Sequence, residues 1–187
     1  MSAPISDAHG REGHGHLAVL ALGANLGDSI EALRSAVELI HADPATEVVA
    51  ASHLYATAPI GGPDQPDFVN AVVIVRTARD PLLLLTLAHE VEAAHDRVRA
   101  LRWGPRTLDV DVIVVDDLQR ADRRLTLPHP RAHERAFVLL PWFELDPLGQ
   151  IPGRGAIADL VNAPDVAVQR IRRLDAQPLA VPMGERS

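Results

Sequence analysis

Residues 68–77 read FVNAVVIVRT, the strongest strand signal in the chain. Valine and isoleucine, both β-branched, fill most of its central positions, and such residues are typical of strands. Two further short apolar runs, LAVLAL at 17–22 and TLDVDVIVV at 107–115, are typical of buried strands. The mixed segment 48–58 is also β-prone. These runs predict a sheet at the centre of the protein.

Two segments between these strands have apolar residues at helical spacing. The first follows Asp28, which resembles a helix N-cap with Glu31 three residues later. The second begins at Asp80-Pro81, a favoured N-cap and first-turn pair. A third helical pattern starts near Phe137. Strands and helices in this order predict an α+β fold, a ferredoxin-like sandwich in which helices pack on a mainly antiparallel sheet.

The length of 187 residues indicates one domain. We expect a flexible tail over residues 1–16, which are rich in Gly and His, one domain over 17–174, and a second loose tail over 175–187. The N-terminus lacks a signal-peptide pattern, and no apolar run near it approaches the ~20 residues of a membrane helix. We therefore expect a cytoplasmic protein with no membrane partner.

The charged residues are unusual, because all 18 basic residues are Arg and the chain has neither Lys nor Cys. The absence of Lys excludes a phosphate loop ending in Gly-Lys-Ser/Thr and any Schiff-base chemistry. The absence of Cys excludes disulfides, a Cys nucleophile and Cys-type zinc sites. A net charge of −7 disfavours broad binding to nucleic acid.

Two acidic residues, Asp109 and Asp111, stand two positions apart in the expected strand 107–115, so their side chains share one face. Two ionised carboxylates this close repel each other and are costly to bury unless a cation neutralises them. A hard ion that keeps waters and shares its coordination with phosphates, Mg²⁺, suits such a pair. The alternative is a solvated strand edge that carries two surface acids.

Four arginines precede the aspartate pair within a short span: Arg97, Arg99, Arg102 and Arg106. Guanidinium groups suit phosphate oxygens. Such a run alone is more often a solvated face, whereas the neighbouring aspartates favour a polyphosphate with its metal.

A binding site for a flat ring is indicated by the few aromatic residues, which make up 3% of the chain. Phe68, Trp103 and Phe137 all fall inside the motifs described here, and two aromatic faces can enclose a planar ligand. Asn70, two positions after Phe68, offers both a donor and an acceptor. The alternative is that these aromatic residues belong to the core.

Four segments together resemble the 6-hydroxymethyl-7,8-dihydropterin pyrophosphokinases of folate biosynthesis. They are ALGANLGD (21–28), YATAPIGGPDQPDFVNAV (55–72), RVRALRWGPRTLDVDVIVVD (97–116) and LTLPHPRAHERAFVLLPWFEL (125–145). The resemblance implies an ATP-dependent transferase that moves pyrophosphate from ATP to the pterin hydroxymethyl group and releases AMP. It also implies ATP as co-substrate and two Mg²⁺ ions.

The same resemblance implies a role for individual residues. The catalytic set is Arg97, Arg106, Asp109 and Asp111, and the two aspartates hold the metal ions. The pterin contacts are Thr57, Ile60, Phe68, Asn70 and Phe137. The ATP contacts are Glu92, Arg99, Arg102, Trp103, His129 and Arg135.

Two other functions stay open at this point. One is a catalytically silent module that binds pterin or nucleotide, and the other is an Arg-rich nucleic-acid binder. For the enzyme we expect two small-molecule substrates, ATP and the hydroxymethyl pterin, and no nucleic-acid partner. We also expect a monomer that docks weakly to neighbouring folate enzymes.

Overall fold

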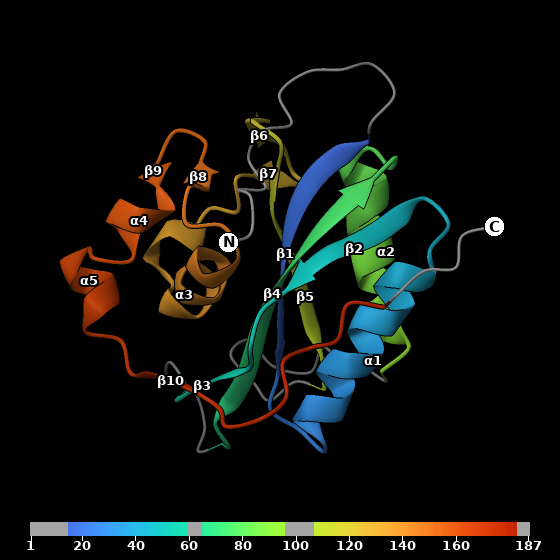
Figure 1. The fold of residues 1–187 in the computed structure, drawn as a ribbon. Coiled ribbons are helices and arrows are strands. Elements are labelled where there is room, and N and C mark those ends of the chain that lie inside the picture. Colours follow the sequence, from blue (N-terminus) through green and yellow to red (C-terminus); the bar gives the residue numbers. More distant parts are fainter. Residues whose placement is uncertain (1–14, 60–64, 96–106, 183–187) are drawn as a thin grey trace.

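The computed structural model describes residues 15–59, 65–95 and 107–182 (Figure 1). Its centre is a six-stranded sheet in the order β10-β3-β4-β1-β5, with β2 also pairing with β4. Every pairing within this sheet is antiparallel. The strands are β1 (His16–Ala24), β2 (Thr46–Ala51), β3 (Tyr55–Thr57), β4 (Phe68–Thr77), β5 (Asp109–Val115) and β10 (Ile171–Arg173).

Helices cover both faces of the sheet, as Figure 1 shows. Helices α1 (Ser29–Ala42) and α2 (Pro81–Ala93) pack on one face, and α3 (Ala136–Leu145) packs on the other. Alternate residues of β1 and β4 face each layer, because successive side chains of a strand point to opposite sides. This arrangement confirms the α+β sandwich with a mainly antiparallel sheet. Among the described residues, no helix has the length and apolar character needed to cross a membrane.

The expected helix starts are confirmed. The Asp28 carboxylate accepts a hydrogen bond from the Glu31 N–H at 3.1 Å, and the Asp80 carboxylate accepts from Leu82 and Leu83 N–H. Each carboxylate satisfies backbone donors that the first turn of a helix leaves without an intrahelical partner.

The remaining elements are short and connect or extend the sandwich. They are β6 (Arg120–Ala121) with β7 (Thr126–Leu127), the 3₁₀ turn η1 (Ala132–Glu134), β8 (Gln150–Ile151) with β9 (Gly155–Ala156), α4 (Ile157–Leu160) and α5 (Pro164–Ala167). Strand β10 returns to the sheet at the free side of β3. Sequence periodicity did not predict these elements. An element of two to four residues spans about one repeat of a helix or strand, and a periodic pattern is visible only over several repeats.

The chain after β10 has no helix or strand, but it packs against the core. Leu179 is 3% exposed and lies in the core cluster beneath α1 and α2. Leu174 and Ala176 pack against the same cluster, and the Leu174 N–H donates to the Leu54 carbonyl at 2.8 Å. The low periodicity of residues 175–187 predicts a loose tail, but single apolar side chains such as Leu179 can be buried without any periodic pattern.

One charge pair anchors the connection between β4 and α2. Arg79 binds the Asp43 carboxylate through both Nε (2.9 Å) and Nη2 (2.5 Å), and the Asp43 side chain is only 5% exposed. The hydrogen bonds from Arg79 hold the pKa of Asp43 below its ordinary value of 3.8. A carboxyl group whose pKa is lowered by folding stabilises the fold at pH values above its ordinary pKa. This contribution disappears as the pH falls through the folded-state pKa.

We expect Arg79→Ala to lower the free energy of unfolding by about 2–3 kcal/mol at pH 7, because it leaves a buried carboxylate without its cation. The loss should shrink as the pH falls below 4, where Asp43 becomes protonated in both states. Urea denaturation at several pH values measures both effects. Arg76→Ala is the control, since Arg76 forms only an exposed 3.8 Å pair with Glu47. Equal losses for the two variants would contradict the assignment.

Candidate active site

The site is built on one row of residues that crosses three neighbouring strands. In the sheet register Gly23 of β1 lies opposite Asn70 of β4 on one side and opposite Asp109 of β5 on the other. Since adjacent strands are about 4.8 Å apart, the Asn70 and Asp109 backbones are separated by about 10 Å. The row therefore places a carboxamide and a carboxylate at two ends of one floor.

The side chains of this row point to the layer that contains α3. On β4, Val72 and Ile74 belong to the core cluster formed with α3, and Asn70 precedes them at the same alternation. On β5, Ile113 belongs to that cluster, and Asp111 and Asp109 precede it in the same way. Six residues from two strands that do not pair with each other thus share a face.

Gly23 keeps the middle of the floor free of side chains. A Cβ added there would lie 3.2 Å from the Asn70 Oδ1, which is closer than side chains normally approach. The same geometry shows that Oδ1 of Asn70 is directed toward the space above Gly23. This position leaves a flat strip of backbone between the carboxamide and the aspartates.

The carboxamide of Asn70 has a defined orientation. The side chain is 4% exposed, and its Nδ2 donates to the Thr57 hydroxyl at 2.9 Å and to the Tyr55 carbonyl at 3.4 Å. The Tyr55 carbonyl oxygen can only accept a hydrogen bond, so it fixes which end of the Asn70 amide is the nitrogen. The acceptor Oδ1 is consequently directed at the floor.

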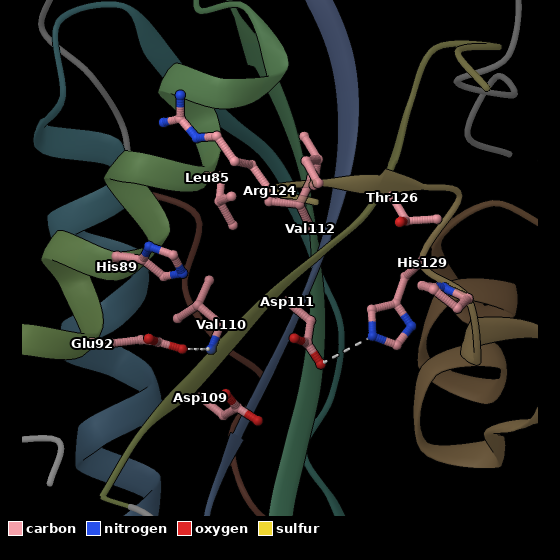
Figure 2. A pocket seen from close by; sticks show the side chains of 12 residues that line it. Leu85, His89, Glu92, Asp109, Val110, Asp111, Val112, Arg124, Thr126 and His129 are labelled. Atoms are coloured by element: carbon pink, nitrogen blue, oxygen red, sulfur yellow. Dashed lines mark hydrogen bonds and ion pairs between the residues drawn. The ribbon is translucent and has the colours of Figure 1, made fainter. Parts of the chain in front are cut away.

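Two aspartates lie side by side on β5, as the alternation predicts, and both are partly exposed. The Arg135 Nη1 is 3.5 Å from the Asp111 Oδ2, and the His129 Nε2 is 4.0 Å from the same oxygen. Figure 2 shows His129 directed at Asp111 from across β5. The Asp111 carboxylate therefore stands opposite one permanent cation and one imidazole.

Burial changes the protonation behaviour of these partners. Burial lowers the pKa of His129 below its ordinary value of 6.5, and the opposing effect of the Asp111 charge does not compensate. His129 is consequently neutral at pH 7, and its Nε2 is available as a donor or an acceptor. Burial likewise lowers the pKa of Arg135, but a guanidinium stays charged at this pH.

A groove runs along the free edge of β5, which is the last strand of the sheet. Its volume is about 270 Å³, and it lies between α2 and the segment 124–130 (Figure 2). Figure 2 shows the apolar side chains Leu85 and Val112 at one end, with Arg124 beside them, and the two aspartates farther along; Leu125 also lines the groove. The remaining lining residues are His89, Glu92, Val110, Thr126, His129 and Pro130.

Glu92 shows how the edge of β5 is oriented. The Glu92 side chain is almost fully buried (3% exposed), and its Oε1 accepts the Val110 backbone N–H at 2.9 Å (Figure 2). That N–H therefore points away from β1 and toward α2. Glu92 lines the groove, but it also satisfies the strand edge beside the aspartates.

Nothing in the described part of the chain brings together three or more metal-ligating side chains. A metal ion bound here would therefore take its remaining ligands from water and substrate. Mg²⁺ is commonly held in this way, through one or two carboxylates and the phosphates of its substrate. Asp109 and Asp111 fit that ion better than they fit Zn²⁺ or Ca²⁺, which need a fuller set of protein ligands.

Two phenylalanines come from two different elements, the sheet and α3. Phe68 begins β4 on the same face as Asn70, and Phe137 lies in the first turn of α3. The Arg135 guanidinium carbon is 5.4 Å from the Phe137 ring centroid, so the cation packs on that ring. Both rings are partly exposed. The sheet and α3 thus each contribute one aromatic ring, and a planar ligand can bind between two such rings.

The far end of α3 is tied to the sheet by a second polar cluster. The Glu144 carboxylate accepts hydrogen bonds from the Tyr55 hydroxyl (2.8 Å) and the His53 N–H (3.2 Å), and it also contacts the His53 imidazole. Burial opposes ionisation of Glu144, but these hydrogen bonds outweigh it and hold its pKa below the ordinary value. The spacing between β3 and α3 is consequently fixed on this side.

The structure describes nine of the residues expected from the sequence. It brings together Thr57, Phe68, Asn70, Glu92, Asp109, Asp111, His129, Arg135 and Phe137 around the floor and the groove. The others, Ile60, Arg97, Arg99, Arg102, Trp103 and Arg106, lie outside the described residues. Sequence reasoning missed Gly23, Arg124 and Thr126. Gly23 had a signal in its position at the end of a strand, whereas the other two had none.

Comparison with known proteins identifies the family of this chain. Residues 19–147 match the family described as 7,8-dihydro-6-hydroxymethylpterin-pyrophosphokinase (HPPK). A 2-amino-4-hydroxy-6-hydroxymethyldihydropteridine pyrophosphokinase of Methylorubrum extorquens is 42% identical over 154 residues, which cover 82% of this chain and 98% of the relative. The enzyme of the same name from Bacillus subtilis is 41% identical over 130 residues, covering 70% of this chain and 78% of the relative.

The fold has counterparts among solved structures. A crystal structure of Plasmodium falciparum HPPK-DHPS aligns with a TM-score of 0.64 at 16% identity, over 82% of this chain and 46% of that longer chain. At this identity the likeness concerns the fold only. The sequence match across the strands and helices that build the site, together with this fold, places the chain in the 7,8-dihydro-6-hydroxymethylpterin-pyrophosphokinase family.

Proposed function

We propose that this protein transfers the pyrophosphoryl group of ATP to the hydroxymethyl group of 6-hydroxymethyl-7,8-dihydropterin and releases AMP. The observation that carries the proposal is the continuity of the two halves of the site. The groove along β5 and the floor over Gly23 meet at Asp109 and Asp111. A nucleotide in the groove and a ring on the floor would therefore bring their reacting ends to the same carboxylates.

The pterin would lie on the strip of backbone over Gly23, between Phe68 and Phe137. The Asn70 Oδ1 would accept a hydrogen bond from a ring N–H or the amino group, since it is directed at this strip. The separation of about 10 Å between Asn70 and Asp109 suits a two-ring heterocycle that carries its hydroxymethyl group at the far end.

ATP would occupy the groove with its base at the end that contains Leu85 and Val112. Leu85, Val112 and Leu125 can cover a purine ring, and Val112 shares the alternation of Val110, whose N–H points outward. The backbone of Val112 would then offer a donor and an acceptor to the base. At the other end Arg135 and His129 stand beside Asp111, where the phosphates would lie.

The reaction forms one bond and breaks one bond. The pterin hydroxyl oxygen attacks the β-phosphorus, the bond from that phosphorus to the oxygen bridging to the α-phosphate breaks, and AMP leaves with that oxygen. The hydroxyl proton is released to solvent. Asp109 and Asp111 would hold Mg²⁺, which when bound neutralises phosphate charge and makes the hydroxyl more acidic. Arg135 would stabilise the charge that builds up on the transferred group, and the walls of the site would exclude water.

The direct test mixes the protein with Mg·ATP and the hydroxymethyl pterin and follows AMP and pterin diphosphate. Equal amounts of the two products are expected. A catalytically silent binding module would bind both ligands in calorimetry without forming AMP, and ADP as the product would contradict pyrophosphoryl transfer. Salt-sensitive binding of DNA or RNA with no turnover would instead favour the nucleic-acid binder.

We expect the monomer to be the working unit, because the fold of a single chain joins the floor over Gly23 to the groove along β5. Sedimentation of the active protein tests this part of the proposal, and a site completed only in a dimer would contradict it.

A further inference from the structure

The side-chain amide of Gln169 is bound to the turn that begins α3. Its Oε1 accepts the Ala136 N–H at 3.0 Å, and its Nε2 donates to the Glu134 carbonyl at 2.7 Å. These two backbone groups belong to the peptide bonds on either side of Arg135. Because each peptide unit is planar, holding both of them restricts the only two soft backbone angles of Arg135. One distant side chain thus fixes the backbone from which the Arg135 guanidinium extends.

Gln169 supplies a helix cap that the local sequence lacks. Arg135 is the N-cap residue of α3, and its own side chain makes no capping hydrogen bond. The first N–H groups of a helix need a partner from outside the helix. Gln169 provides one for Ala136 from 33 positions further along the chain.

The segment that carries Gln169 is itself held by hydrogen bonds and by packing in the core. The Nε2 of Gln169 also donates to the Asp165 carbonyl at 3.0 Å, and Val166 is 2% exposed in the core cluster beneath α3. Two residues after Gln169, Ile171 pairs with Thr57 on β3. The segment 164–173 therefore joins the turn at Arg135 to the strand that orients Asn70.

The Arg135 side chain is directed from this turn into the site. Its guanidinium packs on Phe137 and approaches Asp111, and the side chain is only 19% exposed. The bonds from Gln169 hold the two peptide groups that flank Arg135, whereas the His129 Nδ1 accepts the Arg131 N–H at 3.2 Å at the start of the same segment.

We propose that Gln169 is a positioning residue for the reaction, which orients Arg135 toward the phosphate groups of ATP bound beside Asp111. This inference rests on the proposed function. It assigns a role to a residue of the C-terminal segment, which lies beyond residues 19–147 matched by the family. It also makes a specific claim, that Gln169 acts through one side chain and not through general stability.

A double-mutant cycle separates these two kinds of action. Gln169→Ala should lower kcat/KM for ATP by about 10-fold when Arg135 is present, the usual size of coupling between residues of one hydrogen-bonded unit. In the Arg135→Ala background the same substitution should change kcat/KM less than about twofold, because the side chain that Gln169 orients is gone. The affinity for the pterin alone, measured by calorimetry, should change little in Gln169→Ala.

Asn162→Ala is the matched control. Asn162 is also an amide in the C-terminal segment, and its Nδ2 donates to a backbone carbonyl four residues earlier, that of Ala158. This variant should keep wild-type kinetics. If Gln169→Ala does not fold, Gln169→Met replaces it in the cycle, because methionine has a similar length and no donor or acceptor for these groups.

The outcomes are distinct. If the wild-type protein forms no AMP, the proposed function fails. If the wild-type protein is active and the Gln169 variant matches it, the positioning role is wrong. The role is equally wrong if the loss in kcat/KM is the same in both backgrounds, since that result would mean a general structural effect.

Discussion

Asp111→Ala is expected to lower the rate of AMP release by at least about 10²–10³-fold, the effect of removing one strong electrostatic contact from a transition state. In the structure this carboxylate stands beside the Arg135 guanidinium and His129 at the junction of the groove and the floor. Its removal takes away one of the two oxygen donors for Mg²⁺. Asp109→Ala should cause a loss of similar size.

The fold should not suffer from either substitution. Asp109 and Asp111 are like charges on one strand face, so removing either one relieves repulsion between them. For Asp111 this gain opposes the loss of its 3.5 Å contact with Arg135, so the free energy of unfolding without Mg²⁺ should stay close to the wild-type value. The measurements are AMP release at saturating ATP and a urea denaturation curve. Asp117→Ala is the control, since Asp117 is an exposed acid just beyond the end of β5. Near-normal turnover of either site variant would exclude the metal assignment.

Magnesium dependence gives the same prediction an independent readout. In the wild-type protein, Mg²⁺ should strengthen ATP binding in calorimetry, and Asp111→Ala should lose most of that gain. If the variant keeps the full gain, the ion is bound elsewhere.

Asn70→Ala is expected to weaken pterin binding by about 30- to 100-fold, which corresponds to about 2–3 kcal/mol. The substitution removes the acceptor that is directed at the strip over Gly23, and a ring N–H of the bound ligand then lacks its partner. It also leaves the Thr57 hydroxyl and the Tyr55 carbonyl without the Asn70 amide. Calorimetry with the pterin measures the effect.

Binding of ATP serves as the internal reference for this variant. The groove along β5 lies about 10 Å from Asn70, so ATP affinity should stay within about twofold of the wild-type value. An unchanged affinity for the pterin would remove Asn70 from the site. An equal loss for both ligands would indicate that the sheet itself had been disturbed.

The separate functions of the two halves of the site follow from the position of β5. Because β5 is an edge strand, its aspartate side chains lie at the floor and its outer backbone groups line the groove. Glu92 occupies one edge N–H and leaves the next position of the same alternation to the nucleotide in our proposal. The aspartates lie where the two surfaces meet, so in our proposal one short strand takes part in the binding of both substrates.

Much of the fold could be predicted from local patterns. The strand 68–77 was predicted with the bounds that the structure shows, and the helix starts at Asp28 and Asp80 follow from capping chemistry. These features depend on residues that are near in the chain, so their physical cause is visible in the sequence. The short elements after residue 145 depend on contacts with α3 and β3 and therefore had no local signal.

The site divides in a similar way. The aspartate pair was predictable because strand alternation alone puts the two side chains on one face. The pairing of this strand with Gly23, and of Gly23 with Asn70, was not predictable, because it depends on the register of β5, β1 and β4.

By itself, the sequence determined which chemical groups are available to this protein. They are two carboxylates on one strand, Arg and His as the basic side chains, and a few aromatic residues within the motifs of the expected site. Only the tertiary structure decided the distances and orientations, such as the carboxamide directed at Gly23 and the amide of Gln169 on the turn at Arg135. The physical reason is that side-chain type and alternation are local properties. Strand register and contacts between distant segments are set by how the whole core packs.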